Sequence, residues 1–265
     1  MRTIKILTFL SILLITFCLL TFQSSSAGED PCLTCHADLK QPAKSVHAAI
    51  ALGCSACHKV VEGKSHPGQK GSMALTQNMP GLCYGCHDES KFKGKSVHQP
   101  VSGGMCTGCH NPHSSNSDKI LKSNQPDICY SCHDKAKFTK KYVHRIINVV
   151  GCTACHDPHI SDHPSLLSSS EYELCISCHA AKAKGQHVVA LPGRNKRHPV
   201  RGVKDPSTLK MIKVPDPKNP KRQIEVPDPN VPGKEMSCSS CHDPHSSDFR
   251  GLLTAERICV KCHKF

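Results

Sequence analysis

Apolar positions are concentrated in one part of this chain of 265 residues. An almost unbroken apolar run extends from Ile6 to Phe22, and beyond it apolar residues occur singly or in short groups. No window shows the long helical or alternating period that fills the layers of a helix bundle, a sandwich or a doubly wound sheet. The pattern predicts an irregular fold that is mostly coil, with short α-helices and little β-structure.

The apolar run has the flanks of an export signal. Arg2 and Lys5 precede it, and small residues lead to Ala27, after which we expect cleavage. A retained membrane anchor is the alternative, because the run is at the lower length limit of a membrane span. We therefore expect an exported chain, in the periplasm, associated with the outer membrane or extracellular, where pairing of cysteines into disulfides must be considered.

Composition makes an ordinary apolar core improbable. The chain has no Trp, only 4% aromatic residues and 19 Cys. Disulfides, structural metals or a covalent cofactor must replace the missing core. Eighteen of the cysteines form nine Cys-x-x-Cys pairs, each followed directly by His. The cysteines are Cys32, Cys35, Cys54, Cys57, Cys83, Cys86, Cys106, Cys109, Cys129, Cys132, Cys152, Cys155, Cys175, Cys178, Cys238, Cys241, Cys259 and Cys262, and the histidines are His36, His58, His87, His110, His133, His156, His179, His242 and His263.

The Cys-x-x-Cys-His (CXXCH) spacing is the attachment motif of haem c. Two thiols bind the two vinyl groups of one porphyrin, and the adjacent His binds its iron. Structural zinc, a thioredoxin-like redox pair and a disulfide framework give no reason for a His after every second Cys. The sequence therefore predicts nine covalent haems, and we expect the haem stack to form the core of the fold.

The motifs recur within a longer repeat that divides the chain. In the clearest units a Val-His or His-Pro-Val precedes one CXXCH, an x-Pro-His follows it, and an Ile-Leu or Leu-Leu pair precedes the second CXXCH. We expect a signal at 1–27, a single-haem segment at 28–45 and two-haem units at 46–95, 96–140, 141–186 and 187–265. The last unit contains a basic, Pro-rich insertion at 200–237.

Ten histidines lie outside the motifs, and nine irons with two His ligands each would need nine of them. The position of His163 is filled by Ser117 and Phe249 in equivalent units, so we take His163 as the spare one. The predicted sixth ligands are His47, His66, His98, His113, His144, His159, His187, His198 and His245. A solvated loop histidine is the competing interpretation for His66 and His187, and the sequence does not indicate which His binds which iron.

These repeats resemble the multihaem c-type cytochromes with doubled haem-binding motifs, over nearly all of residues 31–265. The resemblance implies electron transfer through closely spaced haems, from a quinol-linked or periplasmic donor to a terminal or outer-membrane acceptor. The expected partners are other cytochromes, a quinol-linked donor and an outer-membrane porin complex. His66, which stands far from His58, and the insertion depart from the family pattern.

Two other functions stay open at this stage. A multihaem reductase needs one iron with an open position, but the histidines suffice to fill every site, and no substrate is evident. A membrane-anchored quinol-oxidising cytochrome would use residues 6–22 as its anchor. We expect an electron carrier and no enzyme activity.

Net charge gives little reason to expect nucleic-acid binding. The formal charge of +13 includes Arg2 and Lys5 of the signal. With nine haems and their propionates, the processed chain would carry about +2 when oxidised and about −7 when reduced. The basic Pro-rich segment at 180–235 predicts a loop or a two-stranded ribbon, and is either a docking surface for an acidic partner or a solvated insertion.

Overall fold

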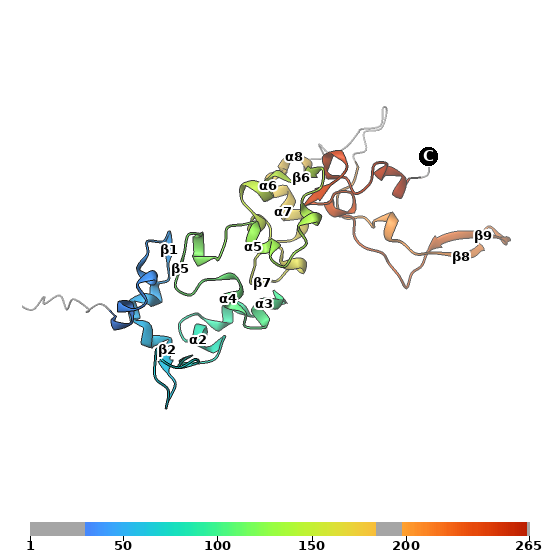
Figure 1. Ribbon diagram of the computed structural model, residues 1–265. Coiled ribbons are helices and arrows are strands. Elements are labelled where there is room, and N and C mark those ends of the chain that lie inside the picture. The colour runs from blue at the N-terminus through green and yellow to red at the C-terminus, as the bar shows by residue number, and fades with distance from the viewer. Residues whose placement is uncertain (1–29, 184–197, 264–265) are drawn as a thin grey trace, which may run out of the picture.

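The protein is described here by a computed structural model that covers residues 30–183 and 198–263. The units follow one another in chain order from one end of an elongated molecule to the other (Figure 1). No helix in these two ranges is long and apolar enough to cross a membrane. The expected signal and His187 lie outside the described residues.

All helices in the described part are short. The α-helices are α2 (Gly81–Tyr84), α3 (Gln99–Ser102), α4 (Cys106–Cys109), α5 (Asp127–Tyr130), α6 (Arg145–Val149), α7 (Glu171–Cys178) and α8 (Ala180–Ala183). The 3₁₀ helices are Pro31–Thr34, Ala37–Lys40, Ala48–Leu52, Cys54–Ala56, Glu89–Phe92, Asp118–Ile120, Lys135–Phe138, Cys152–Ala154, Pro164–Leu166, Pro206–Thr208, Cys238–Ser240, Arg250–Leu252 and Ile258–Lys261. The prediction of an irregular fold with short helices is confirmed.

The β-structure consists of small two-stranded antiparallel sheets. The strands are β1 (Ser45–Val46), β2 (His58–Val60), β3 (Met73–Leu75), β4 (Ser96–Val97), β5 (Ser114–Ser115), β6 (Tyr142–Val143), β7 (Ile160–Ser161), β8 (Met211–Asp216), β9 (Asn219–Pro227) and β10 (Ser246–Ser247). β2 pairs with β3 and β8 with β9, whereas β1–β5, β4–β7 and β6–β10 join residues of different repeat units. The predicted low β content is therefore confirmed, but the units are linked to one another.

The CXXCH motif itself folds as one tight turn. In eight of the nine motifs the N–H of the His donates to the carbonyl of the first Cys, over 2.9–3.1 Å. Side chains three and four positions apart lie on the same side of such a turn. Both thiols and the imidazole therefore face one side of the backbone. His58 differs, because it begins strand β2.

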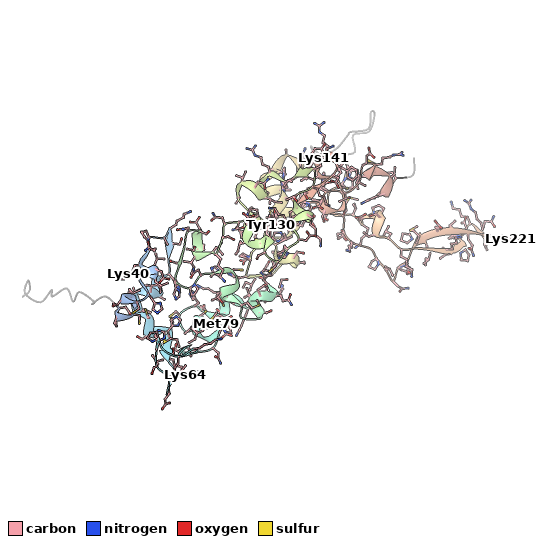
Figure 2. All side chains as sticks on the ribbon, in the orientation of Figure 1. Lys40, Lys64, Met79, Tyr130, Lys141 and Lys221 are labelled. Atoms are coloured by element: carbon pink, nitrogen blue, oxygen red, sulfur yellow. The ribbon has the colours of Figure 1, made fainter. Side chains whose placement is uncertain are left out.

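An apolar core of the usual kind is missing from the described residues. Ile147 and Met236 are the only apolar side chains buried there. The insertion of the last unit forms a hairpin, β8–β9, whose strands contact chiefly each other. It projects from the body, with Lys221 near its far end (Figures 1 and 2). The two-stranded ribbon, one of the two forms expected for this segment, is therefore the one present.

Candidate haem sites

Imidazole rings meet in pairs throughout the described chain. Each pair combines the His of one CXXCH motif with one of the other histidines, and the ring centroids are 6.0–6.2 Å apart. The pairs are His36–His66, His58–His113, His87–His47, His110–His159, His133–His98, His156–His245, His179–His144 and His263–His198. His66, despite its unusual place in the sequence, is one of the paired residues.

The spacing of these rings fits one metal ion between them. An imidazole nitrogen binds a metal at about 2.0 Å and the ring centroid lies about 1.2 Å behind it, so two imidazoles on opposite sides of one ion have centroids about 6.3 Å apart. Rings in van der Waals stacking lie closer, with less room for an ion. The donor set also fits haem c, because every pair lies beside two cysteines of a CXXCH motif.

The pairing follows a rule that runs across unit boundaries. The His of a Val-His or His-Pro-Val segment pairs with the second motif of its own unit, as His98 does with His133. The His of a Pro-His segment pairs with the first motif of the preceding unit, as His159 does with His110. His66 follows the second rule, because its partner His36 belongs to the preceding single-haem segment.

Short strands hold the two kinds of histidine together. His47, His98 and His144 each follow one strand of the β1–β5, β4–β7 and β6–β10 sheets. Their backbone N–H groups donate to the carbonyls of His113, His159 and His245, over 2.8–2.9 Å. Their Nδ1–H groups donate to the carbonyls of Pro112, Pro158 and Pro244, each over 2.9 Å. The Nδ1 hydrogen bond leaves Nε2 with its lone pair for a metal.

Left-handed turns orient three of the motif histidines. The Nδ1–H groups of His110, His156 and His242 donate to the carbonyls of Lys119, Ser165 and Gly251, over 2.8–2.9 Å. Each acceptor has a φ between 57° and 72°. Non-glycine residues seldom adopt this conformation, and it is often found at functional sites. Sequence reasoning missed this role, although the Ile-Leu and Leu-Leu pairs that form part of the turns were visible repeats.

We expect Lys119→Gly to stabilise the folded protein by about 1 kcal/mol. The left-handed conformation costs a non-glycine residue roughly 1–2 kcal/mol, and part of this gain is offset because glycine loses more conformational freedom on folding. Guanidinium unfolding of the haem-loaded chain, followed by far-UV circular dichroism, measures the change. Gly251→Ser is the matched reverse substitution and should destabilise by a similar amount. A lower midpoint for Lys119→Gly would contradict the role of backbone strain here.

The Pro-His histidines are held in a different way. The backbone N–H groups of His113, His159 and His245 donate to the side-chain oxygens of Asn111, Asp157 and Asp243, over 2.8–3.0 Å, which accounts for the residue before Pro in the repeat. Burial lowers the pKa of all three histidines, and the carboxylates of Asp157 and Asp243 partly oppose this shift at His159 and His245. A lowered pKa favours the neutral imidazole that binds metals.

Aromatic side chains pack on two of these half-buried rings. Phe92 meets His159 edge-on, with centroids 5.5 Å apart, and Phe138 meets His245 in the same way at 5.0 Å. Tyr84 and Tyr130, which lie within CXXCH motifs, contact the two phenylalanines at 5.6 Å. Four of the few aromatic residues in the chain therefore support predicted iron ligands.

Cysteines of consecutive motifs are neighbours in space. Burial and then the Cys106 thiol raise the pKa of Cys83 to about 11, and Cys57 adds to the shift. A hydrogen bond to Cys129 lowers the pKa of Cys152 to about 7. Corresponding effects link Cys32 with Cys54, Cys109 with Cys129, Cys155 with Cys178, Cys175 with Cys238, and Cys241 with Cys262. The motifs thus form a single file in chain order.

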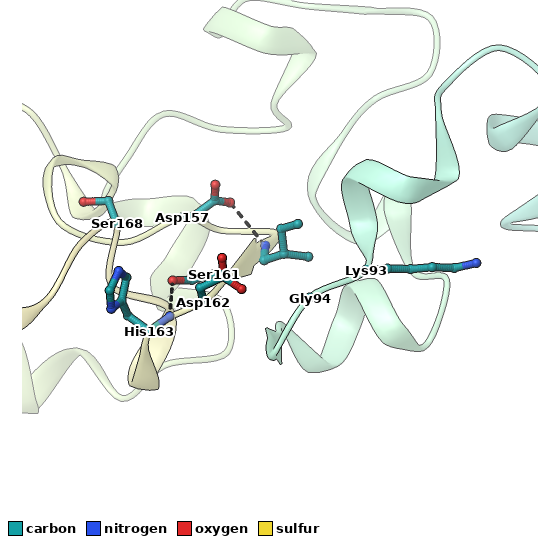
Figure 3. Close-up of a pocket in the computed structure, with 8 residues that line it drawn as sticks. Lys93, Gly94, Asp157, Ser161, Asp162, His163 and Ser168 are labelled. Atoms are coloured by element: carbon teal, nitrogen blue, oxygen red, sulfur yellow. Dashed lines mark hydrogen bonds between the residues drawn. The ribbon is translucent and has the colours of Figure 1, made fainter.

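His163 stands apart from these pairs. Its ring is paired with no other imidazole in the described parts of the chain, and it lines a surface pocket with Lys93, Asp157 and Asp162 (Figure 3). Its backbone N–H donates to the hydroxyl of Ser161 over 2.9 Å. The equivalent Ser117 and Phe249 donate to Ser115 and Ser247 in the same way. In all three units the backbone N–H at this position forms the same hydrogen bond, whichever side chain is present.

Comparison with known proteins agrees with this architecture. A search of curated proteins gives no match. The family model described as the doubled CXXCH motif matches residues 47–92, 98–138, 144–184 and 230–265, which is more than half of the chain. The chain therefore belongs to the doubled CXXCH motif family and is a multihaem c-type cytochrome.

Proposed function

We propose that this protein is an electron-transfer conduit that carries nine covalent haems, each with two histidine ligands. The single observation that supports this most strongly is the set of eight imidazole pairs with centroids 6.0–6.2 Å apart. When bound, haem supplies reversible one-electron chemistry between ferric and ferrous iron. The eight pairs use sixteen of the eighteen expected ligands. His242 and His187 complete the set, and we propose them as the ninth pair, although His187 lies outside the described residues.

The chain's own residues favour a carrier over an enzyme. Two histidines per iron leave no position for a substrate, and the Nδ1 hydrogen bonds keep the rings in the orientation that binds metal. Because cysteines of consecutive motifs are neighbours, they would hold consecutive haems close to one another. We propose that the protein works outside the cytoplasm, in the periplasm or at the outer membrane, with redox proteins as donor and acceptor.

Haem content per chain and low-temperature EPR of the oxidised protein test this function. We expect nine haems by pyridine haemochrome assay and mass spectrometry, with only low-spin ferric signals. A high-spin signal from about one iron in nine would contradict the saturated carrier and favour a reductase. Fewer than nine haems would contradict the proposed count.

A further inference from the structure

A carboxylate joins the last two units at their haem-binding motifs. Glu171 lies four residues before Cys175, and Ser239 directly follows Cys238. Oε1 of Glu171 accepts the backbone N–H of Ser239 over 2.7 Å, and its Oε2 accepts the Ser239 hydroxyl over 3.1 Å. The first N–H groups of a helical turn have no partner within the turn, so a side-chain acceptor there is favourable.

A similar contact joins the two preceding units, where the fifth CXXCH motif (Cys129–His133) meets the sixth (Cys152–His156). Gln125 lies four residues before Cys129, and Thr153 directly follows Cys152. Oε1 of Gln125 accepts the Thr153 N–H over 3.1 Å, while its Nε2 donates to the Thr153 hydroxyl over 3.0 Å. Glu171 and Gln125 therefore contact the same two groups with a different charge, and the hydrogen bond with the hydroxyl has the opposite direction. The recurrence indicates that geometry, rather than charge, is what the two sites share.

A third contact joins the first two motifs. Asp30 accepts the N–H of Cys32 at Oδ1 over 3.0 Å and the N–H of Cys54 at Oδ2 over 2.7 Å. These hydrogen bonds, with that from Cys54 first, hold the pKa of the Asp30 carboxyl well below its ordinary value. The carboxylate is therefore charged at neutral pH and bridges the starts of two motifs.

The remaining unit boundary, between the third and the fourth CXXCH motif, lacks such a contact and provides an internal comparison. Met79 lies four residues before Cys83 (Figure 2), the position that Gln125 and Glu171 occupy before Cys129 and Cys175. Thr107 follows Cys106, as Thr153 and Ser239 follow their cysteines. A thioether cannot form the two hydrogen bonds seen with Glu171 or Gln125. The two segments still approach closely here, since a Cβ on Gly104 would lie 2.8 Å from Cδ of Pro80, just as a Cβ on Gly151 would lie 2.8 Å from Cβ of Gln125.

We propose that Asp30, Gln125 and Glu171 are positioning residues that fix consecutive haem-binding motifs relative to each other at unit boundaries. The β1–β5, β4–β7 and β6–β10 sheets join strands of different units, and each tethers the two histidines that pair with the two motifs of one unit. In the described residues no sheet does the same for the two motifs that meet at a unit boundary, and at three boundaries these side chains provide the link. This inference rests on the proposed function, because it concerns the spacing of adjacent haems.

Glu171→Ala in the haem-loaded full chain tests the proposal. We expect the Ser239 amide to exchange with deuterium about tenfold faster, in proportion to one lost hydrogen bond. We also expect a changed Soret circular dichroism couplet, because coupling between adjacent haems depends on their relative orientation. Glu171→Gln should restore both signals, since Gln125 contacts the same two groups natively. Glu173→Ala, on the same helix but exposed, should change neither.

A gain of contact provides the second variant. Met79→Gln should slow amide exchange at Thr107, because it supplies the missing acceptor and donor. The proposal is overturned if Glu171→Ala leaves both signals unchanged, or if Glu171→Gln behaves like Glu171→Ala. Failure of the proposed function would be seen separately, as fewer than nine haems or a high-spin signal in the unsubstituted protein. Amide exchange at Ser239 would still decide whether Glu171 makes the proposed contact.

Discussion

Replacing His98 with Ala should convert about one-ninth of the ferric iron from low spin to high spin, because one iron of nine would lose a nitrogen ligand. His98 pairs with His133 at a centroid distance of 6.1 Å, and its Nδ1 donates to the Pro158 carbonyl. Alanine offers no ligand atom, so water or an empty position would replace the imidazole. Low-temperature EPR and the charge-transfer absorption of high-spin haem measure the converted fraction.

Two further variants give this result its meaning. His163→Ala should leave the spectrum unchanged, because His163 is unpaired with any other imidazole in the described ranges. His98→Met should keep the iron low-spin but raise the potential of one haem, as Met ligation does in cytochromes c. An unchanged spin state in His98→Ala would show that His98 is not the sixth ligand, and the pairing rule would be wrong.

The parts of the fold that follow from local chemistry could be predicted from sequence. The CXXCH spacing specifies one turn with two thiols and an imidazole on one side, and the structure forms that turn at Cys129–His133 with a 3.0 Å hydrogen bond. The absence of long periodic apolar runs likewise predicts the irregular fold, because long helices and strands need such runs to pack, whereas helices of a few residues do not. The ligand role of His66 stays a prediction, although its place beside His36 supports it.

What escaped prediction depends on contacts distant in sequence. Strands of two residues carry no detectable alternation, so the pairing of Val97 with Ile160 was invisible. The left-handed Lys119 and Ser165 gave no signal, because neither is the glycine or asparagine that usually marks this conformation. The contacts of Asp30, Gln125 and Glu171 use three residue types, and side-chain identity alone does not show that they act alike.

Removing one haem from the middle of the file should interrupt conduction, whereas removing one from the end should only shorten the path. In the Cys152→Ala/Cys155→Ala variant we expect eight haems and loss of end-to-end current, because electron tunnelling weakens steeply with the gap between neighbouring haems. Cys129 and Cys175 belong to the flanking motifs, which would then have no haem between them. Single-molecule conductance along the long axis is the measurement.

The matched control is Cys32→Ala/Cys35→Ala, which removes the same number of haems from the end of the file. Haem content should be equal in the two variants, so a difference in conductance reports position rather than cofactor loss. Single file predicts that the control keeps most of its current, because its eight remaining motifs stay consecutive. Equal losses in both variants would mean that electrons bypass the missing haem, and that the file is branched.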